Sequence, residues 1–209
     1  MLKDCIIDVI EPKAAATFFH TKEPHPERLS KARQLLLESN VVAAIDIYQE
    51  LASAGSPKSM LALGNFYRRG EGVQPALKQA EHWYLSAIDL GFVPAAYALG
   101  LNYLKQTYYR KATAQFRAAA QRGFLPAIYM LGEMYFRGQG VDRSINKARE
   151  LWELANTKQF LPAKLALGKL LMSGFYGITP GFRGIWLQLE AAVMRRFLQK
   201  KNKWDERLG

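Results

Sequence analysis

The sequence has one cysteine and three histidines among its 209 residues. A single thiol, Cys5, excludes an intramolecular disulfide framework and any multi-cysteine zinc site. His20, His25 and His82 share no helical metal-ligand spacing with a carboxylate, so we expect no metal and no other cofactor. The sequence also lacks nucleophile-elbow, kinase and dinucleotide-binding signatures. We therefore predict a protein that is not an enzyme.

Long apolar runs are missing as well. Hydrophobic residues make up 49% of the chain, but no run approaches the roughly 20 residues that a membrane-spanning helix needs. The opening stretch, MLKDCIIDVIEPK, is interrupted by Asp8 and lacks the apolar core of a secretory signal. The chain is long enough to bury a core without disulfides. We expect a cytoplasmic protein, with peripheral membrane association left open.

Acidic residues are scarce in most of the chain. The 29 Lys and Arg against 18 Asp and Glu give a net charge of +11, distributed as −2 over residues 1–54 and +13 over residues 55–209. No acid occurs between Asp89 and Glu133, a stretch that holds Lys105, Arg110, Lys111, Arg117 and Arg122. Such a block is usual for a solvated helix face and also suits an anionic partner. Composition does not choose between the two.

An internal repeat organises the chain. The pair Leu-Gly recurs with its glycine at 64, 100, 132 and 168, spaced by 36, 32 and 36 residues. Small residues four positions before each leucine and mostly Tyr four positions after it form one face of a helix, which we name helix A. A second stripe in each unit predicts a helix B. Its members are Ala44, Tyr48 and Ala52; Ala80, Tyr84 and Ile88; Ala112, Phe116 and Ala120; and Ala148, Trp152 and Asn156.

Glycine and proline mark the helix boundaries. Gly55, Gly91 and Gly123 predict the ends of B helices, and Pro94, Pro126 and Pro162 predict the starts of A helices. Two units connect A to B through Arg-Gly-x-Gly-Val at residues 69–73 and 137–141, where glycine tolerates positive φ. This turn follows a helix and lacks a Gly-Lys-Ser/Thr sequence, which argues against a phosphate-binding loop. The unit with 32-residue spacing has lost the turn.

The combined motif resembles the Sel1-like repeat, a relative of the tetratricopeptide repeat. The clearest unit is 59–91, followed by 127–159, a shortened unit at 95–123 and a degenerate pair at about 28–55. The resemblance implies an all-α, right-handed α-α superhelix of about four antiparallel helix pairs over residues 28–176. Stacking is also what the physics requires, because one pair cannot bury both of its stripes. Residues 1–27 form an N-terminal arm, for which an ordered segment and a disordered tail both fit.

Residues 177–209 contain a predicted basic amphipathic helix. Over 182–204 an apolar stripe lies opposite Arg195, Arg196, Lys200 and Lys203. We interpret this helix as a cap on the open end of the solenoid. Binding to a partner groove and binding to an anionic membrane surface are the alternatives.

The resemblance implies an adaptor or scaffold that binds a protein partner, in the assembly or regulation of a multi-protein complex. A helices line the inner, concave wall of such solenoids, so their non-core columns are the predicted binding surface. We predict Asn65, Arg69, Tyr97, Leu101, Lys105, Tyr129, Glu133, Arg137 and Lys169. Basic residues beside tyrosines suit an acidic or extended peptide. Alternatively, the cations complement helix dipoles and Tyr97 and Tyr129 are packing residues. Nucleic acid is a further alternative partner, and the oligomeric state is left open.

Overall fold

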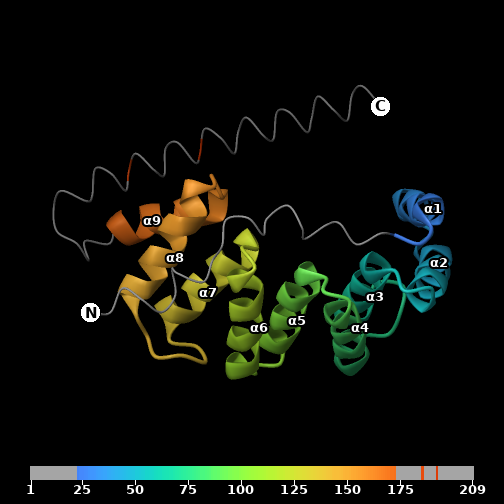
Figure 1. Cartoon of the computed structure of the whole chain (residues 1–209), viewed down its shortest axis with the longest axis horizontal. Coiled ribbons are helices and arrows are strands. Elements are labelled where there is room, and N and C mark those ends of the chain that lie inside the picture. Colours follow the sequence, from blue (N-terminus) through green and yellow to red (C-terminus); the bar gives the residue numbers. More distant parts are fainter. Residues whose placement is uncertain (1–22, 173–184, 186–191, 193–209) are drawn as a thin grey trace. The chain divides into compact units, whose positions relative to one another are not determined.

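The computed structural model describes residues 23–172, Ile185 and Ala192, and over residues 23–172 it consists of nine helices without a strand (Figure 1). The predicted all-α fold is confirmed. The helices are α1 (Pro26–Leu37), α2 (Val41–Ser53), α3 (Pro57–Arg69), α4 (Leu77–Asp89), α5 (Val93–Lys105), α6 (Tyr109–Gln121), α7 (Leu125–Arg137), α8 (Ile145–Thr157) and α9 (Leu161–Met172). Odd-numbered helices are A helices and even-numbered ones are B helices.

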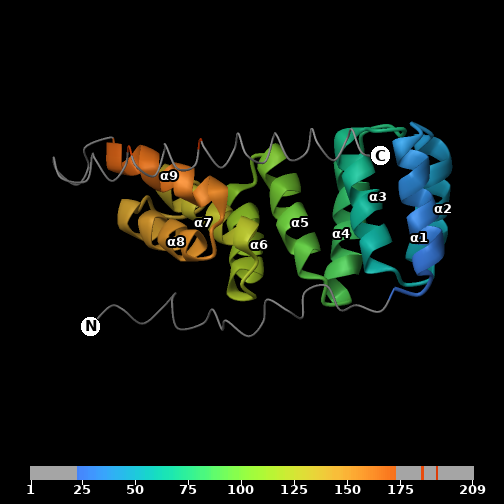
Figure 2. The ribbon, with the colours of Figure 1, turned by 90° about the horizontal axis from the view of Figure 1, so that it is seen from above.

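The described chain divides into two compact units. Unit 1 comprises residues 23–127 and 139–141, and unit 2 comprises residues 128–138 and 142–172. In unit 1 the helices α1 to α6 follow one another in chain order, and each packs against the next (Figures 1 and 2). In unit 2, α8 packs against α9. Each unit is thus built from antiparallel helices with short connections, which is the construction of an α-solenoid.

The predicted helix boundaries are confirmed. Gly55, Gly91 and Gly123 follow B helices and have φ of +87°, +76° and +82°, the left-handed conformation that ends many helices. Proline occupies the first or second position of α3 and α5, where its missing N–H leaves no bond unmade. Helix α1 begins at Pro26, so the first A helix starts two residues before the predicted boundary at residue 28.

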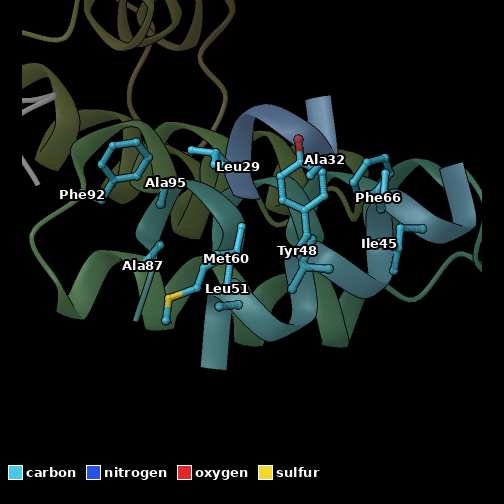
Figure 3. Packing of buried hydrophobic residues seen from close by; sticks show 13 residues of the cluster. Leu29, Ala32, Ile45, Tyr48, Leu51, Met60, Phe66, Ala87, Phe92 and Ala95 are labelled. Carbon is cyan, nitrogen blue, oxygen red and sulfur yellow. The ribbon is translucent and has the colours of Figure 1, made fainter. Parts of the chain in front are cut away.

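The core of unit 1 combines residues of the predicted stripes, such as Tyr48, with residues outside them, such as Phe66. Tyr48 of α2 is 4% exposed, and its ring centroid lies 5.8 Å from that of Phe66 of α3. Figure 3 shows these rings among Ala32, Leu51 and other buried apolar residues of α1 to α5. The core thus combines large rings with alanines, and the small side chains allow neighbouring helices to approach closely.

The Gly-x-Gly turns pack against the beginning of a B helix. A Cβ on Gly72 would lie 2.6 Å from the side chain of Val41, the first residue of α2. A Cβ on Gly140 would lie 2.4 Å from the backbone oxygen of Tyr109, the first residue of α6. Glycine is needed at both positions because φ is positive and the backbone approaches so closely.

The shortened unit makes the corresponding contact with a side chain. Asn102 of α5 is fully buried, and its Nδ2 donates to the backbone oxygen of Leu77, the first residue of α4, at 3.0 Å. At the next position of α5, the hydroxyl of Tyr103 donates a hydrogen bond to the carboxylate of Glu81 of α4 at 2.6 Å. These two hydrogen bonds connect α5 to α4 where the other units place a turn.

Residues 1–22 of the predicted arm (1–27) lie outside the described residues, as does the predicted C-terminal basic face (Arg195, Arg196, Lys200 and Lys203). None of the helices described by the structure is long and apolar enough to cross a membrane. Within the same residues, His, Cys, Asp and Glu form no group of three or more that could hold a metal ion.

Candidate partner-binding surface

The A-helix face of unit 1 is hollowed by a pocket of about 350 Å³, which we name the A-helix pocket. Its walls come from α1, α2 and α3 and from the start of α5. The pocket is lined by Leu29, Arg33, Tyr48, Lys58, Leu61, Ala62, Asn65, Phe92 and Pro94. Most of this surface is apolar, so the pocket offers a place for an aliphatic or aromatic side chain.

The polar groups of the A-helix pocket favour an anion. Arg33 is exposed and Lys58 is half-buried, and none of the described lining residues is acidic. Burial raises the pKa of the Tyr48 phenol, and the charge of Arg33 opposes this only in part, so the phenol is neutral at physiological pH. The pocket thus combines two cations with apolar walls. This combination suits a carboxylate next to an apolar group.

Of the predicted binding residues, Asn65 is the one that lines this pocket. It belongs to α3, as does Leu61 of the neighbouring predicted column. The Asn65 Oδ1 accepts a hydrogen bond from the hydroxyl of Tyr84 at 3.0 Å. This bond holds the amide in place, and burial raises the pKa of the Tyr84 phenol, which keeps the proton on the donor.

The predicted cations of unit 1 make local contacts. Arg69 is exposed, and its Nη1 lies 3.3 Å from a carboxylate oxygen of Glu71 in the following turn. Lys105 is exposed, and its Nζ donates to the backbone oxygen of Arg68 near the C-terminus of α3 at 2.9 Å. Contacts of this kind are what the helix-dipole interpretation expects.

Tyr97 is half-buried in a cluster of aromatic rings. Its ring centroid lies 5.8 Å from that of Phe116 and 5.5 Å from that of Phe124. Burial raises the pKa of its phenol. Leu101, one turn further along α5, is also half-buried. These contacts give Tyr97 a packing role.

The remaining predicted residues lie in unit 2. Tyr129 packs against Trp152 and Phe160, with ring centroids 6.5 Å and 6.1 Å away. Glu133 and Arg137 form an ion pair within α7, with 2.9 Å between Nη2 and Oε2. Lys169 is exposed on α9. Tyr129 therefore has a packing role in unit 2, as Tyr97 has in unit 1.

Sequence reasoning missed most of the pocket lining, although a signal for two of these residues exists. Leu29 and Arg33 stand 32 residues before Leu61 and Asn65, so they continue two predicted columns into α1 with the spacing of the shortened unit. Lys58 and Pro94 are 36 residues apart and occupy equivalent positions in the first turns of α3 and α5. Helix starts were interpreted as boundaries and not as part of a surface.

A second pocket of about 520 Å³, which we name the Tyr108 pocket, lies where the Gly-x-Gly turn is lost. Its lining residues are Thr107, Tyr108, Tyr109, Arg110, Lys111 and Gly140. Tyr108 is 52% exposed, and the Lys111 Nζ lies 5.5 Å from the centroid of its ring. Aromatic rings beside exposed cations are typical of surfaces that bind anionic chains.

The Sel1 repeat family model matches residues 57–92 and 125–159, which correspond to the α3–α4 and α7–α8 pairs. No curated protein matches the sequence. The fold is similar to three bacterial structures.

A protective antigen from uropathogenic Escherichia coli that displays an SLR fold is 26% identical, with a TM-score of 0.64 over 72% of this chain and 33% of its own. The chain therefore spans about a third of the length of that antigen. A Sel1 repeat protein from Oxalobacter formigenes is 22% identical, with a TM-score of 0.70 over 86% of this chain and 78% of its own. A protein from Pseudomonas aeruginosa is 20% identical, with a TM-score of 0.55 over 87% of this chain and 67% of its own.

The matched repeats, the in-phase helix pairs and the shared fold agree with one another. The α5–α6 pair, which lacks the Gly-x-Gly turn, lies outside the two matched ranges and keeps the same helix lengths. Together these findings show that the chain contains Sel1 repeats at residues 57–92 and 125–159 and has the α-solenoid fold of the SLR structures that it resembles.

Proposed function

We propose that this protein is a non-catalytic adaptor whose A-helix pocket binds a peptide segment of a partner protein, with an acidic and an apolar side chain next to each other. Sel1 repeat proteins are generally protein-interaction scaffolds. The observation that carries the proposal is the pocket itself, in which Arg33 and Lys58 border walls made by Leu29, Leu61 and Phe92.

The A-helix pocket and such a peptide are complementary in polarity and charge. An apolar side chain that enters the pocket leaves water, which favours binding by about 25 cal/mol per Å² of buried area. A neighbouring carboxylate meets two cations at the pocket, and charge-assisted hydrogen bonds of this kind are stronger than those between neutral groups. The net charge of +11 accelerates the approach of an acidic partner.

The predicted columns extend this proposed surface. Arg69 and Lys105 belong to the same A helices as the pocket, and Asn65 connects the column to the pocket lining. In unit 2 the exposed cations Arg137 and Lys169 are the equivalent candidates. Partner binding by these columns remains a prediction, because most of these residues already have contacts within the chain.

Fluorescence polarisation with two labelled octapeptide pools tests the proposal. In one pool each position of the peptide is Asp, Glu, Leu or Phe. In the other pool Lys and Arg replace Asp and Glu. We expect the wild-type chain to bind the acidic pool selectively at physiological salt. Lys58→Glu should weaken this binding by about tenfold or more, because a repulsive charge then lines the pocket.

Lys78→Glu is the matched control, because Lys78 is an exposed residue of α4 that does not line the pocket. It changes the net charge equally and should alter the dissociation constant by no more than about twofold. Equal losses in both variants would show that net charge alone attracts the acidic pool, and the pocket assignment would then be wrong.

A second candidate function is binding of single-stranded nucleic acid at the Tyr108 pocket, favoured by the exposed Tyr108 and Tyr109 beside Arg110 and Lys111. Bases stack on tyrosine rings while the cations contact phosphates. An oligothymidine probe should then bind with a steep salt dependence, and a Tyr108→Ala/Lys111→Ala variant should lose most of the affinity. Absence of binding at low salt would eliminate this candidate.

A further inference from the structure

Glu23 places a carboxylate of the chain itself beside the A-helix pocket. Its Oε2 accepts a hydrogen bond from the hydroxyl of Ser56 at 2.5 Å, and its Oε1 lies 3.5 Å from the Nζ of Lys58. The side chain of Glu23 is only 8% exposed. Because Lys58 also lines the pocket, this carboxylate adjoins the space proposed for the partner.

From these contacts we infer that Ser56 and Lys58 form a carboxylate-binding subsite of the A-helix pocket. Glu23 occupies the subsite in the free protein, and an Asp or Glu side chain of the partner peptide replaces it in the complex. The inference rests on the proposed function and goes further, because it names the atoms that recognise the partner's acid and the internal group that competes with it.

The subsite is held in place by the start of α3. Ser56 is the N-cap residue of this helix, and its Oγ accepts from the backbone N–H of Ser59 at 3.2 Å. The hydroxyls of Ser56 and Ser59 are 2.9 Å apart, and both residues are fully buried. The Ser56 hydroxyl is therefore fixed in position to donate toward a carboxylate. The N-terminal end of the helix dipole adds a favourable field for a negative charge.

Glu23 fills the subsite imperfectly. Its Oε1 is buried and has no hydrogen-bond partner among residues 23–172, since 3.5 Å from Lys58 is longer than a normal hydrogen bond. A buried carboxylate oxygen without a donor is costly. Pro24 and Pro26 limit how the backbone next to Glu23 can adjust. A peptide carboxylate is free of this constraint on its approach to Ser56 and Lys58, so it can compete with Glu23 for the subsite.

Lys58 belongs both to the carboxylate-binding subsite and to the lining of the A-helix pocket. From Ser56 at its N-cap, α3 leads to Lys58, Leu61 and Ala62, which line the pocket with Phe92 and Pro94 of the neighbouring connection and helix. A carboxylate in the subsite therefore positions an adjacent apolar side chain of the same peptide toward the pocket walls. The recognised element is an acidic residue followed or preceded closely by an aliphatic or aromatic one.

The test uses the full chain and the acidic octapeptide pool in a fluorescence polarisation titration. Glu23→Gln keeps the shape of the side chain and removes its charge, so we expect the dissociation constant to fall about three- to tenfold. Glu23→Asp shortens the side chain, so that its carboxylate no longer reaches Ser56. It should also lower the dissociation constant. Glu27→Gln is the matched control, because Glu27 is exposed on α1 and its loss changes the net charge equally.

Lys58→Met provides the coupling measurement. We expect it to weaken binding and to reduce the effect of a further Glu23→Gln substitution to less than about twofold, because the two side chains then no longer share a partner. Circular dichroism melting of each variant shows that the fold is retained.

The outcomes separate the subsite from the proposed function. If the wild-type chain binds the acidic pool selectively but Glu23→Gln and Glu23→Asp leave the affinity unchanged or weaker, the subsite inference is overturned and the adaptor proposal stands. Equal tightening by Glu27→Gln would also overturn it, as an effect of net charge. If no variant prefers the acidic pool over the basic one, the proposed function itself fails.

Discussion

The indole of Trp152 lies so close to the backbone of Gly132 that a Cβ atom on this glycine would stand 2.4 Å from Nε1. Trp152 is 2% exposed, and its Nε1 donates to the backbone oxygen of Tyr129 at 3.2 Å, so the ring cannot move away freely. We predict that Gly132→Ala lowers the free energy of unfolding by about 1–3 kcal/mol, because overpacking outweighs the gain of up to about 1 kcal/mol in helix propensity.

Chemical denaturation of the purified variant measures this change. In a Gly132→Ala/Trp152→Leu double variant the smaller side chain makes room for the methyl group, so its loss of stability should be less than the sum of the two single losses. An unchanged or higher stability of Gly132→Ala would contradict the close contact.

Substitution by alanine should reduce stability by different amounts at two glycines that have the same backbone conformation. Gly91 and Gly140 have φ of +76° and +73°, but a Cβ on Gly91 meets nothing within 4 Å, whereas one on Gly140 meets the backbone oxygen of Tyr109 at 2.4 Å. We predict that Gly91→Ala costs about 1–2 kcal/mol, from the left-handed conformation alone, and that Gly140→Ala costs clearly more. Equal costs in parallel denaturation curves would show that the turn does not press against α6.

Tyr103 should make stability decrease at high pH. Burial, together with the hydrogen bond to Glu81 and the charge of that carboxylate, raises the pKa of Tyr103 to about 12. An unfolded tyrosine ionises near pH 10. The neutral phenol is therefore favoured in the folded state, and this contribution is fully present below pH 10 and is lost as the pH rises through 12.

We therefore predict a falling free energy of unfolding between pH 10 and 12, measured by denaturation at several pH values. Tyr103→Phe should be less stable than the wild type at neutral pH, by about 1 kcal/mol for the lost hydrogen bond, and its stability should fall less steeply over this range. Identical slopes for the two chains would contradict the assignment to Tyr103.

Asn102→Asp should be strongly destabilising at neutral pH. The substitution replaces the donor to the Leu77 oxygen by a carboxylate in a fully buried position. We expect a loss of about 2–4 kcal/mol, with partial recovery at acid pH, where the protonated acid can donate to the same oxygen. Gln79→Glu, at an exposed position of α4, is the control and should have little effect. A variant as stable as the control would show that the hydrogen bond to Leu77 is not needed.

The helices could be predicted from the sequence because each must bury one stripe. Glycine and proline then define where the stripes end, so the bounds of α2 to α9 follow closely from columns such as Gly55, Gly91 and Gly123. Helix α1 was harder, since Ala32 takes the place of the column glycine and the exposed Lys31 that of its leucine.

The candidate site was less accessible to sequence reasoning. Periodicity placed Tyr97 in a non-core column and left open whether it binds a partner or packs within the chain. The contacts of its ring with Phe116 and Phe124 depend on the distance and angle between helices, which the sequence does not give. The A-helix pocket is formed where the starts of α3 and α5 meet the middle of α1. In the sequence, residues at helix starts indicate where a helix begins. The same pattern does not indicate that these residues also line a pocket.

The hydrogen bond from Asn102 to Leu77 lies in the pair whose repeat length differs from that of its neighbours. The α5–α6 pair keeps two helices of 13 residues although its spacing is four residues shorter than that of its neighbours. In this pair a side chain of the A helix contacts the start of the preceding B helix, which a Gly-x-Gly turn contacts in the pairs α3–α4 and α7–α8. A difference of four residues in repeat length is therefore confined to the connection between α5 and α6 and leaves both helices unchanged in length.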